Sequence, residues 1–255
     1  MKVSIQSSVL AAVVAASMCA AAQAVPETYT WNFDSPQGAL GTSQSYTSAV
    51  TPSGPSPVDV TAYGFQVKYS GKTATQVEGE TGKAIDLYGK QQGGTENGLG
   101  LNNYPDSEIG FRTVNQDGQD CQYGDDGSTT YEGFVQVDLT NLLNIPNVDP
   151  FATITIGSLQ NGTYDAFASS TLGTIGTNEI INHSTTTPNT FLLSDFSLAD
   201  PYLTITANDQ KGLDKSILLS TLSVSTNNAA PEPATLGMLA IGGAGLLLGR
   251  RRKTA

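Results

Sequence analysis

Residues 133–139 read Gly-Phe-Val-Gln-Val-Asp-Leu, and their apolar and polar side chains alternate. Alternation with a period of two is typical of a β-strand, in which successive side chains point to opposite faces of a sheet. Val135, Val137 and Leu139 therefore share one face, which we expect to lie in a hydrophobic core.

Further short runs of β-branched and aromatic residues follow the same pattern, and clusters of Gly, Asn, Asp and Pro separate them. They are Thr28 to Asp34, Gly64 to Ser70, Lys83 to Tyr88, Phe151 to Ile156, Thr163 to Ala168, Thr190 to Leu198, Tyr202 to Ala207 and Ile217 to Val224. Trp31 alternates with Tyr29 and Phe33, which favours a place in the core. About ten strands and no helix between the two ends predict an all-β fold, an antiparallel β-sandwich.

The first 24 residues have the features of a secretory signal peptide, which we expect to be helical. Lys2 supplies a positive charge, Val9 to Ala22 is apolar, and Ala22-Gln23-Ala24 is a small-x-small cleavage site. We expect signal peptidase to cut after Ala24. The exported domain would then begin at Val25 and extend to residue 225.

The other end of the chain carries a second targeting pattern. Pro231-Glu232-Pro233 precedes an apolar run, Ala234 to Gly249, and the basic cluster Arg250-Arg251-Arg252-Lys253 follows the run. An apolar run of this kind enters lipid as a transmembrane helix, and a basic cluster keeps its far end in the cytoplasm. Residues 226–230 are then a polar spacer, and residues 231–255 are a tail.

This tail resembles the PEP-CTERM family of bacterial sorting signals in its Pro-Glu-Pro triplet, its Gly- and Leu-rich run and its terminal arginines. The resemblance implies processing by an exosortase of a Gram-negative bacterium, after a transient association with the inner membrane through the C-terminal helix. The product would reach the cell surface or the extracellular space. The alternative is a tail anchor that is never cut, but the run is shorter than the ~20 residues that span a bilayer comfortably.

The central part is similar to the jelly-roll domains that often precede such tails. The similarity rests on Asp86-Leu87-Tyr88, on Glu96 to Leu101 as a turn, on Ser107-Glu108-Ile109 and on Phe134 to Leu139. It implies a jelly-roll-like winding of the sandwich.

The exported part, residues 25–230, holds seven basic and 22 acidic residues, a formal charge of −15. This charge argues against nucleic acid and anionic membrane surfaces as partners. It suits a soluble exported domain and also the binding of divalent cations.

The sequence gives little support to catalysis. His183 is the only histidine, it lies in a stretch with the composition of a loop, and no Gly-x-Ser-x-Gly motif supplies a nucleophile. A zinc site is not expected either, since one histidine and one cysteine do not furnish the usual nitrogen and sulfur ligands. A glycosidase needs only two carboxylates, yet pairs such as Asp106 and Glu108 sit in no distinctive motif. We therefore expect a protein that is not an enzyme.

The residues favour a calcium site over a zinc site or a catalytic site. Asp117, Asp120, Asp125 and Asp126 place four carboxylates in a Gly-containing loop, and hard oxygen ligands of this kind suit Ca²⁺. A site near Glu96 and Glu108 is a second option, and an ordinary solvated acidic loop is the alternative to both. The same loop contains Cys121, whose role the sequence leaves open.

Tyrosines beside polar loops could stack on sugar rings, and Tyr104, Tyr123 and Tyr131 are the candidates. We expect an exported surface or extracellular-matrix protein with a structural or adhesive role in an exopolysaccharide matrix. The alternative is a carbohydrate-binding module for the exopolysaccharide, followed by a glycoside hydrolase.

Overall fold

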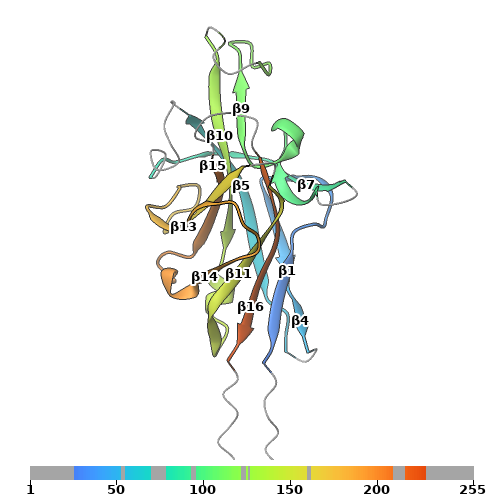
Figure 1. Ribbon diagram of the computed structural model, residues 1–255, viewed down its shortest axis with the longest axis vertical. Coiled ribbons are helices and arrows are strands. Elements are labelled where there is room, and N and C mark those ends of the chain that lie inside the picture. The colour runs from blue at the N-terminus through green and yellow to red at the C-terminus, as the bar shows by residue number, and fades with distance from the viewer. Residues whose placement is uncertain are drawn as a thin grey trace, which may run out of the picture. The chain divides into compact units, whose positions relative to one another are not determined.

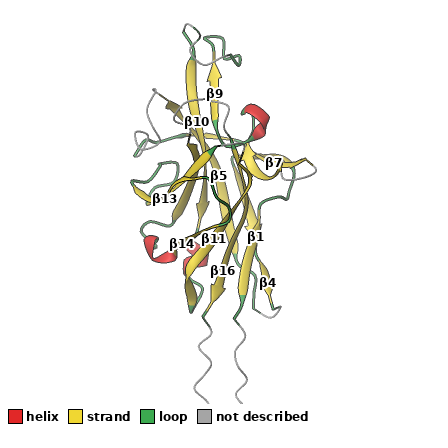
Figure 2. Ribbon diagram, viewed as in Figure 1, coloured by secondary structure: helices red, strands yellow, loops and turns green. Residues whose placement is uncertain are grey.

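The computed structural model describes residues 26–52, 55–69, 79–92, 96–121, 125, 127–159, 162–208 and 216–227. Nearly all of them belong to one compact unit, Glu27–Thr226. Strands make up most of this unit, and its helical segments are short (Figure 2). No helix within the described ranges is both long enough and apolar enough to cross a membrane. The expected signal helix and the expected C-terminal helix lie outside those ranges.

Two antiparallel sheets form the unit, and we call them sheet A and sheet B. Sheet A has the strand order β14-β11-β16-β8-β7-β2, and β1 pairs with β16 and with β4. Its strands are β1 (Thr28–Asn32), β2 (Gly38–Gly41), β4 (Ala49–Thr51), β7 (Leu87–Gln92), β8 (Glu96–Leu101), β11 (Val148–Leu159), β14 (Asn189–Leu192) and β16 (Ile217–Thr226). Figure 1 shows β1 beside β16, the first and last strands of the fold.

Sheet B has the order β13-β12-β15-β10-β5-β3, with β6 paired to β5 and β9 paired to β10. Its strands are β3 (Ser43–Thr47), β5 (Asp59–Tyr69), β6 (Lys83–Ile85), β9 (Phe111–Val114), β10 (Thr129–Asp138), β12 (Thr163–Ser169), β13 (Asn178–Ser184) and β15 (Tyr202–Asn208). The helical segments are α2 (Thr140–Leu143), η2 (Pro105–Ser107) and η3 (Leu193–Asp195). The antiparallel sandwich that the strand pattern predicts is confirmed.

The main core lies between the sheets and includes the face predicted from residues 133–139. Val135, Val137 and Leu139 are at most 1% exposed and belong to one cluster with Trp31. Gly133 and Gly64 face this core too, since a Cβ at either position would meet Leu101. Trp31 is fully buried, and its indole nitrogen donates to the carbonyl of Val58 at 2.8 Å.

The opposite, outer face of sheet B is also covered. Phe65 and Val67 do not point into the main core. They form a second cluster with Phe134, Phe167 and Ile175. The segment around Gly173 covers this cluster, and the Gly173 amide donates to Gln136 Oε1 at 2.6 Å. The predicted faces of β5 and β10 therefore have buried side chains on both sides.

Four elements differ from the expectation. Thr190 to Leu198 is a strand only as far as Leu192, where β14 ends and the 3-10 helix η3 begins. Lys83 to Tyr88 is two strands in different sheets, because the chain crosses at Asp86 from β6 in sheet B to β7 in sheet A. Glu96 to Leu101 is the strand β8 and not a turn. His183 lies in β13, at a positive φ of 46°, and not in a loop.

Candidate functional site

The sandwich ends at the strand that leads to the tail. β16 pairs with β1 from Thr221 to Ser225, and the Thr226 amide donates to the carbonyl of Glu27 at 2.8 Å. The Glu27 amide in turn donates to Thr226 Oγ1 at 3.1 Å. The predicted sorting residues Pro231, Glu232, Pro233 and Arg250 to Lys253 lie outside the described residues, and so do Ala22 and Ala24 of the predicted signal peptidase site.

β16 is an interior strand of sheet A. β11 pairs with it on one side, and β1 and β8 pair with it on the other. A chain that leaves the fold from Thr226 is therefore continuous with a strand that has hydrogen-bonded neighbours on both edges.

The acidic loop is only partly described. Asp117 and Asp125 are exposed, and Asp120 Oδ1 accepts from Arg112 Nε at 2.7 Å. Asp126 lies outside the described residues. Asp117, Asp120 and Asp125 form no cluster of ligand atoms within the described part of the chain. The calcium site stays a prediction.

Glu96 and Glu108, the second option for a calcium site, both form ion pairs with Lys90. The Lys90 ammonium lies 2.7 Å from Glu108 Oε1 and 3.1 Å from Glu96 Oε2, and Glu108 is fully buried. Burial lowers the pKa of Lys90, but the hydrogen bonds to Glu108 and Glu96 raise it more, so its pKa is raised. These carboxylates already neutralise a buried cation.

The structure places the predicted sugar-stacking tyrosines in different surroundings. Tyr104 is 5% exposed and its hydroxyl donates to Gln66 Oε1 at 3.4 Å, so it is a core residue and not a sugar platform. Tyr123 lies outside the described residues, and Tyr131 is a half-buried residue of β10. Tyr88 lines an open groove of about 550 Å³ together with Gln37, Lys90, Gln91 and Asp106.

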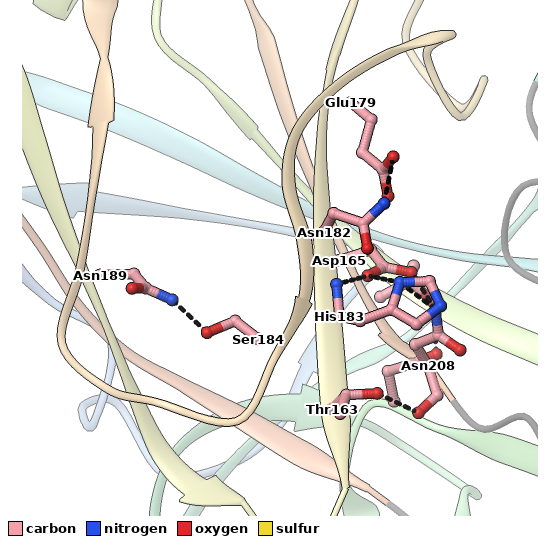
Figure 3. A network of polar contacts seen from close by, with 10 residues as sticks. Thr163, Asp165, Glu179, Asn182, His183, Ser184, Asn189 and Asn208 are labelled. Carbon is pink, nitrogen blue, oxygen red and sulfur yellow. Dashed lines mark hydrogen bonds and ion pairs between the residues drawn. The ribbon is translucent and has the colours of Figure 1, made fainter.

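A cluster on β12, β13 and β15 brings His183, the only histidine of the chain, next to a buried carboxylate. Asp165 of β12 is fully buried, and its Oδ1 accepts from the His183 amide at 2.5 Å and lies 3.2 Å from His183 Nδ1 (Figure 3). Asp165 Oδ2 accepts from Asn208 Nδ2. Glu179 Oε2 accepts from Asn182 Nδ2 at 2.8 Å. The carboxylates of Asp165 and Glu179 and the His183 imidazole offer ligand atoms within 4.8 Å of one another.

A β-bulge creates this arrangement. Tyr164 pairs with Ser184 and Ala166 pairs with Ile181, so Asn182 and His183 together oppose the single residue Asp165. The extra residue bends the strand, and His183 adopts the left-handed conformation that Asn, Asp and His tolerate best. The bulge turns the imidazole toward Asp165 and Asn208, where Asn208 Nδ2 lies 2.9 Å from His183 Nε2.

Glu132 adds a second buried carboxylate to the same face of sheet B. It is fully buried, Thr206 Oγ1 donates to its Oε1 at 2.7 Å, and its Oε2 has no hydrogen-bond partner. Burial is the main cause that raises the pKa of Glu132, to about 8, and the charge of Asp165 raises it further. Burial also raises the pKa of Asp165, against hydrogen bonds from His183 and Asn208.

Sequence reasoning missed this cluster, because strand pairing brings together residues of β12, β13 and β15 that lie apart in the chain. One signal was present. Asp165 lies among apolar residues in Tyr164 to Phe167, and a carboxylate inside an apolar strand is rarely buried without a partner. The expectation that a zinc site needs further nitrogen and sulfur ligands left out carboxylates, which also bind zinc.

A comparison with known protein families supports the predicted sorting tail. Residues 229–253 match a family model described as the PEP-CTERM protein-sorting motif. The comparisons with curated proteins and with solved structures found no match. The motif begins three residues after Thr226, so it follows the sandwich almost directly. It indicates a protein that is exported and sorted by an exosortase to the surface of a Gram-negative bacterium.

Proposed function

We propose that the sandwich is a structural or adhesive unit of an exopolysaccharide matrix, held at the cell surface by its sorted tail. The observation that carries this proposal is the exit of the tail from β16, an interior strand. The first strand begins at the same end, because Thr28 pairs with Ser225. The opposite end, which carries the hairpin of β9 and β10 in Figure 1, is where contacts to the matrix would form.

This geometry suits a domain under tension. A pull on Thr226 acts along β16, so the hydrogen bonds to β11 and β1 are loaded together and do not open one after another. Resistance to forced unfolding depends on the unfolding rate, which is low when many bonds must break in one step. A tail on an edge strand would lack one of these two ladders.

The test is matrix cohesion in the native host. A deletion strain should shed its matrix under shear flow, and the full chain should restore cohesion. The matched control replaces Arg250, Arg251 and Arg252 with glutamine, which leaves the sandwich unchanged but removes the basic cluster of the tail. A deletion strain with normal cohesion, or full rescue by the glutamine variant, would contradict the proposal.

A jelly-roll-like winding belongs to the same proposal. Its support is that β16 lies between β11 and β8 in sheet A while β15 lies between β12 and β10 in sheet B, so that late and early strands interleave. The absence of catalysis is proposed as well. It is supported by the full burial of both Glu132 and Asp165, which keeps these carboxylates from direct contact with a polysaccharide.

The second candidate is a carbohydrate-binding module, and the groove beside Tyr88 favours it. One aromatic ring with the amides of Gln37 and Gln91 around it is a combination that can stack on a sugar ring and bind its hydroxyls. Tyr88→Ala should then abolish retardation of the protein in gels that contain the host polysaccharide. Tyr202→Ala is the control, since Tyr202 lies on β15 and does not line this groove.

A further inference from the structure

The cluster of Asp165, Glu179 and His183 has the composition of a metal site and not of a simple ion pair. Its three ligand atoms lie within 4.8 Å of one another, and they come from two neighbouring strands, β12 and β13. Zinc ligands at 2.0–2.2 Å in a tetrahedron are about 3.3–3.6 Å apart. The 3.2 Å between His183 Nδ1 and Asp165 Oδ1 is close to this separation. Glu179 is half-buried, and a rotation of its side chain would complete the set.

The negative charge of this cluster favours the binding of a cation. Asp165 is fully buried, and so is Glu132 on the same face of sheet B. Within the described residues, no lysine or arginine forms an ion pair with Asp165, Glu132 or Glu179. The Asp165 carboxylate is buried with hydrogen-bond donors but with no lysine or arginine beside it among the described residues, so a positive ion bound to it would offset its desolvation.

An independent observation points to the same place. Glu132 Oε2 is a buried acceptor with no hydrogen-bond partner, and Thr206 joins the other oxygen of Glu132 to the strand that pairs with Asp165. Asn208, on the same strand, donates to Asp165 and lies against the imidazole. These residues hold the ligands in position, as polar groups around a metal commonly do.

We infer that Asp165, Glu179 and His183 bind one divalent transition-metal ion of the zinc class. The imidazole nitrogen selects against Ca²⁺ and Mg²⁺, which take oxygen ligands, and two carboxylates complete a set that Zn²⁺ accepts. Three protein ligands leave the fourth position to water. The site joins β12 to β13, which lies at an edge of sheet B.

The test uses the full chain without a polyhistidine tag, stripped with EDTA and titrated with Zn²⁺ alone. We expect calorimetry to give one ion per chain. His183→Asn should weaken binding by more than about 100-fold, because asparagine accepts the positive φ but removes the nitrogen ligand. Glu179→Gln should weaken it by about 10-fold or more. Fluorescence of Trp31, the only tryptophan, checks that each variant is folded.

Two variants control for other binding sites. Asp117→Asn reports on the acidic loop and Cys121→Ser on the single thiol of the exported domain, and both should leave zinc affinity unchanged. NMR adds a direct readout, because His183 is the only histidine and gives the only imidazole signals. The inference is overturned if Zn²⁺ leaves these signals unchanged, if His183→Asn binds zinc within about 3-fold of the parent, or if either control abolishes binding.

Discussion

Replacement of Lys90 by methionine should be among the most damaging single changes in the sandwich. Lys90 is 5% exposed and its ammonium contacts the fully buried Glu108 and the partly exposed Glu96. Removal of one member of a buried pair costs about 3–5 kcal/mol, because the other charge keeps its desolvation penalty. The pair with Glu96 is more exposed and contributes about 1 kcal/mol or less. We therefore expect Lys90→Met to lower the free energy of unfolding by about 3–5 kcal/mol.

Urea unfolding followed by Trp31 fluorescence measures this loss, since Trp31 is fully buried in the main core. With a slope of about 3 kcal/mol per M, the midpoint should fall by roughly 1–1.7 M urea. Glu96→Gln is the matched control and should shift the midpoint by about 0.3 M or less. Lys90→Met with Glu108→Met should recover most of the loss, because apolar replacement of a whole buried pair is often neutral. If Lys90→Met costs no more than Glu96→Gln, the reasoning is refuted.

Three further predictions test other parts of the molecule. Burial raises the pKa of Glu132 to about 8 in the folded state, whereas in the unfolded state the carboxyl loses its proton above pH ~4.5. The folded state therefore binds one more proton between these values. The free energy of unfolding, measured in EDTA, should fall as the pH rises from 5 to 8. Glu132→Gln should flatten that pH profile in urea titrations, and an unchanged slope would contradict the assignment. Gly133→Ala should lower the free energy of unfolding by about 1–3 kcal/mol, because the added Cβ would lie 2.3 Å from Leu101. An unchanged free energy of unfolding would mean that Gly133 does not face the core. Neutral residues in place of Arg250 to Arg252 should block processing of the tail, measured by intact mass from the host; normal cleavage would remove the proposed role of the cluster.

The sequence predicted what depends on local pattern. The alternation in residues 133–139 identified β10 and its core face, and the spacing of Tyr29, Trp31 and Phe33 placed Trp31 in the core. Both inferences need only the period of a strand. The tail could be recognised for a similar reason, because its triplet, apolar run and basic cluster are contiguous.

Other features depend on contacts between distant segments and could not be read locally. Phe65 and Val67 have the pattern of a core face, but their face of β5 meets Phe134 and Phe167 under a covering segment. Periodicity does not tell which of two covered faces is the main core. Lys83 to Tyr88 looks continuous because the crossing at Asp86 changes the partner strands and not the local composition.

The position of His183 links the candidate metal site to the stability of the sheet. β13 is an edge strand, and an exposed edge offers unpaired backbone groups to other chains. The bulge at Asn182 and His183 interrupts that edge, but it also leaves few regular ladder bonds between β12 and β13. Asp165 replaces one of them by accepting from the His183 amide, at the cost of burying a carboxylate. A metal ion on Asp165 and His183 would offset that cost and fix the bulge in place. Zinc should therefore slow amide hydrogen exchange in β13 more than in β14, the edge strand of sheet A, and equal effects on both strands would argue against this coupling.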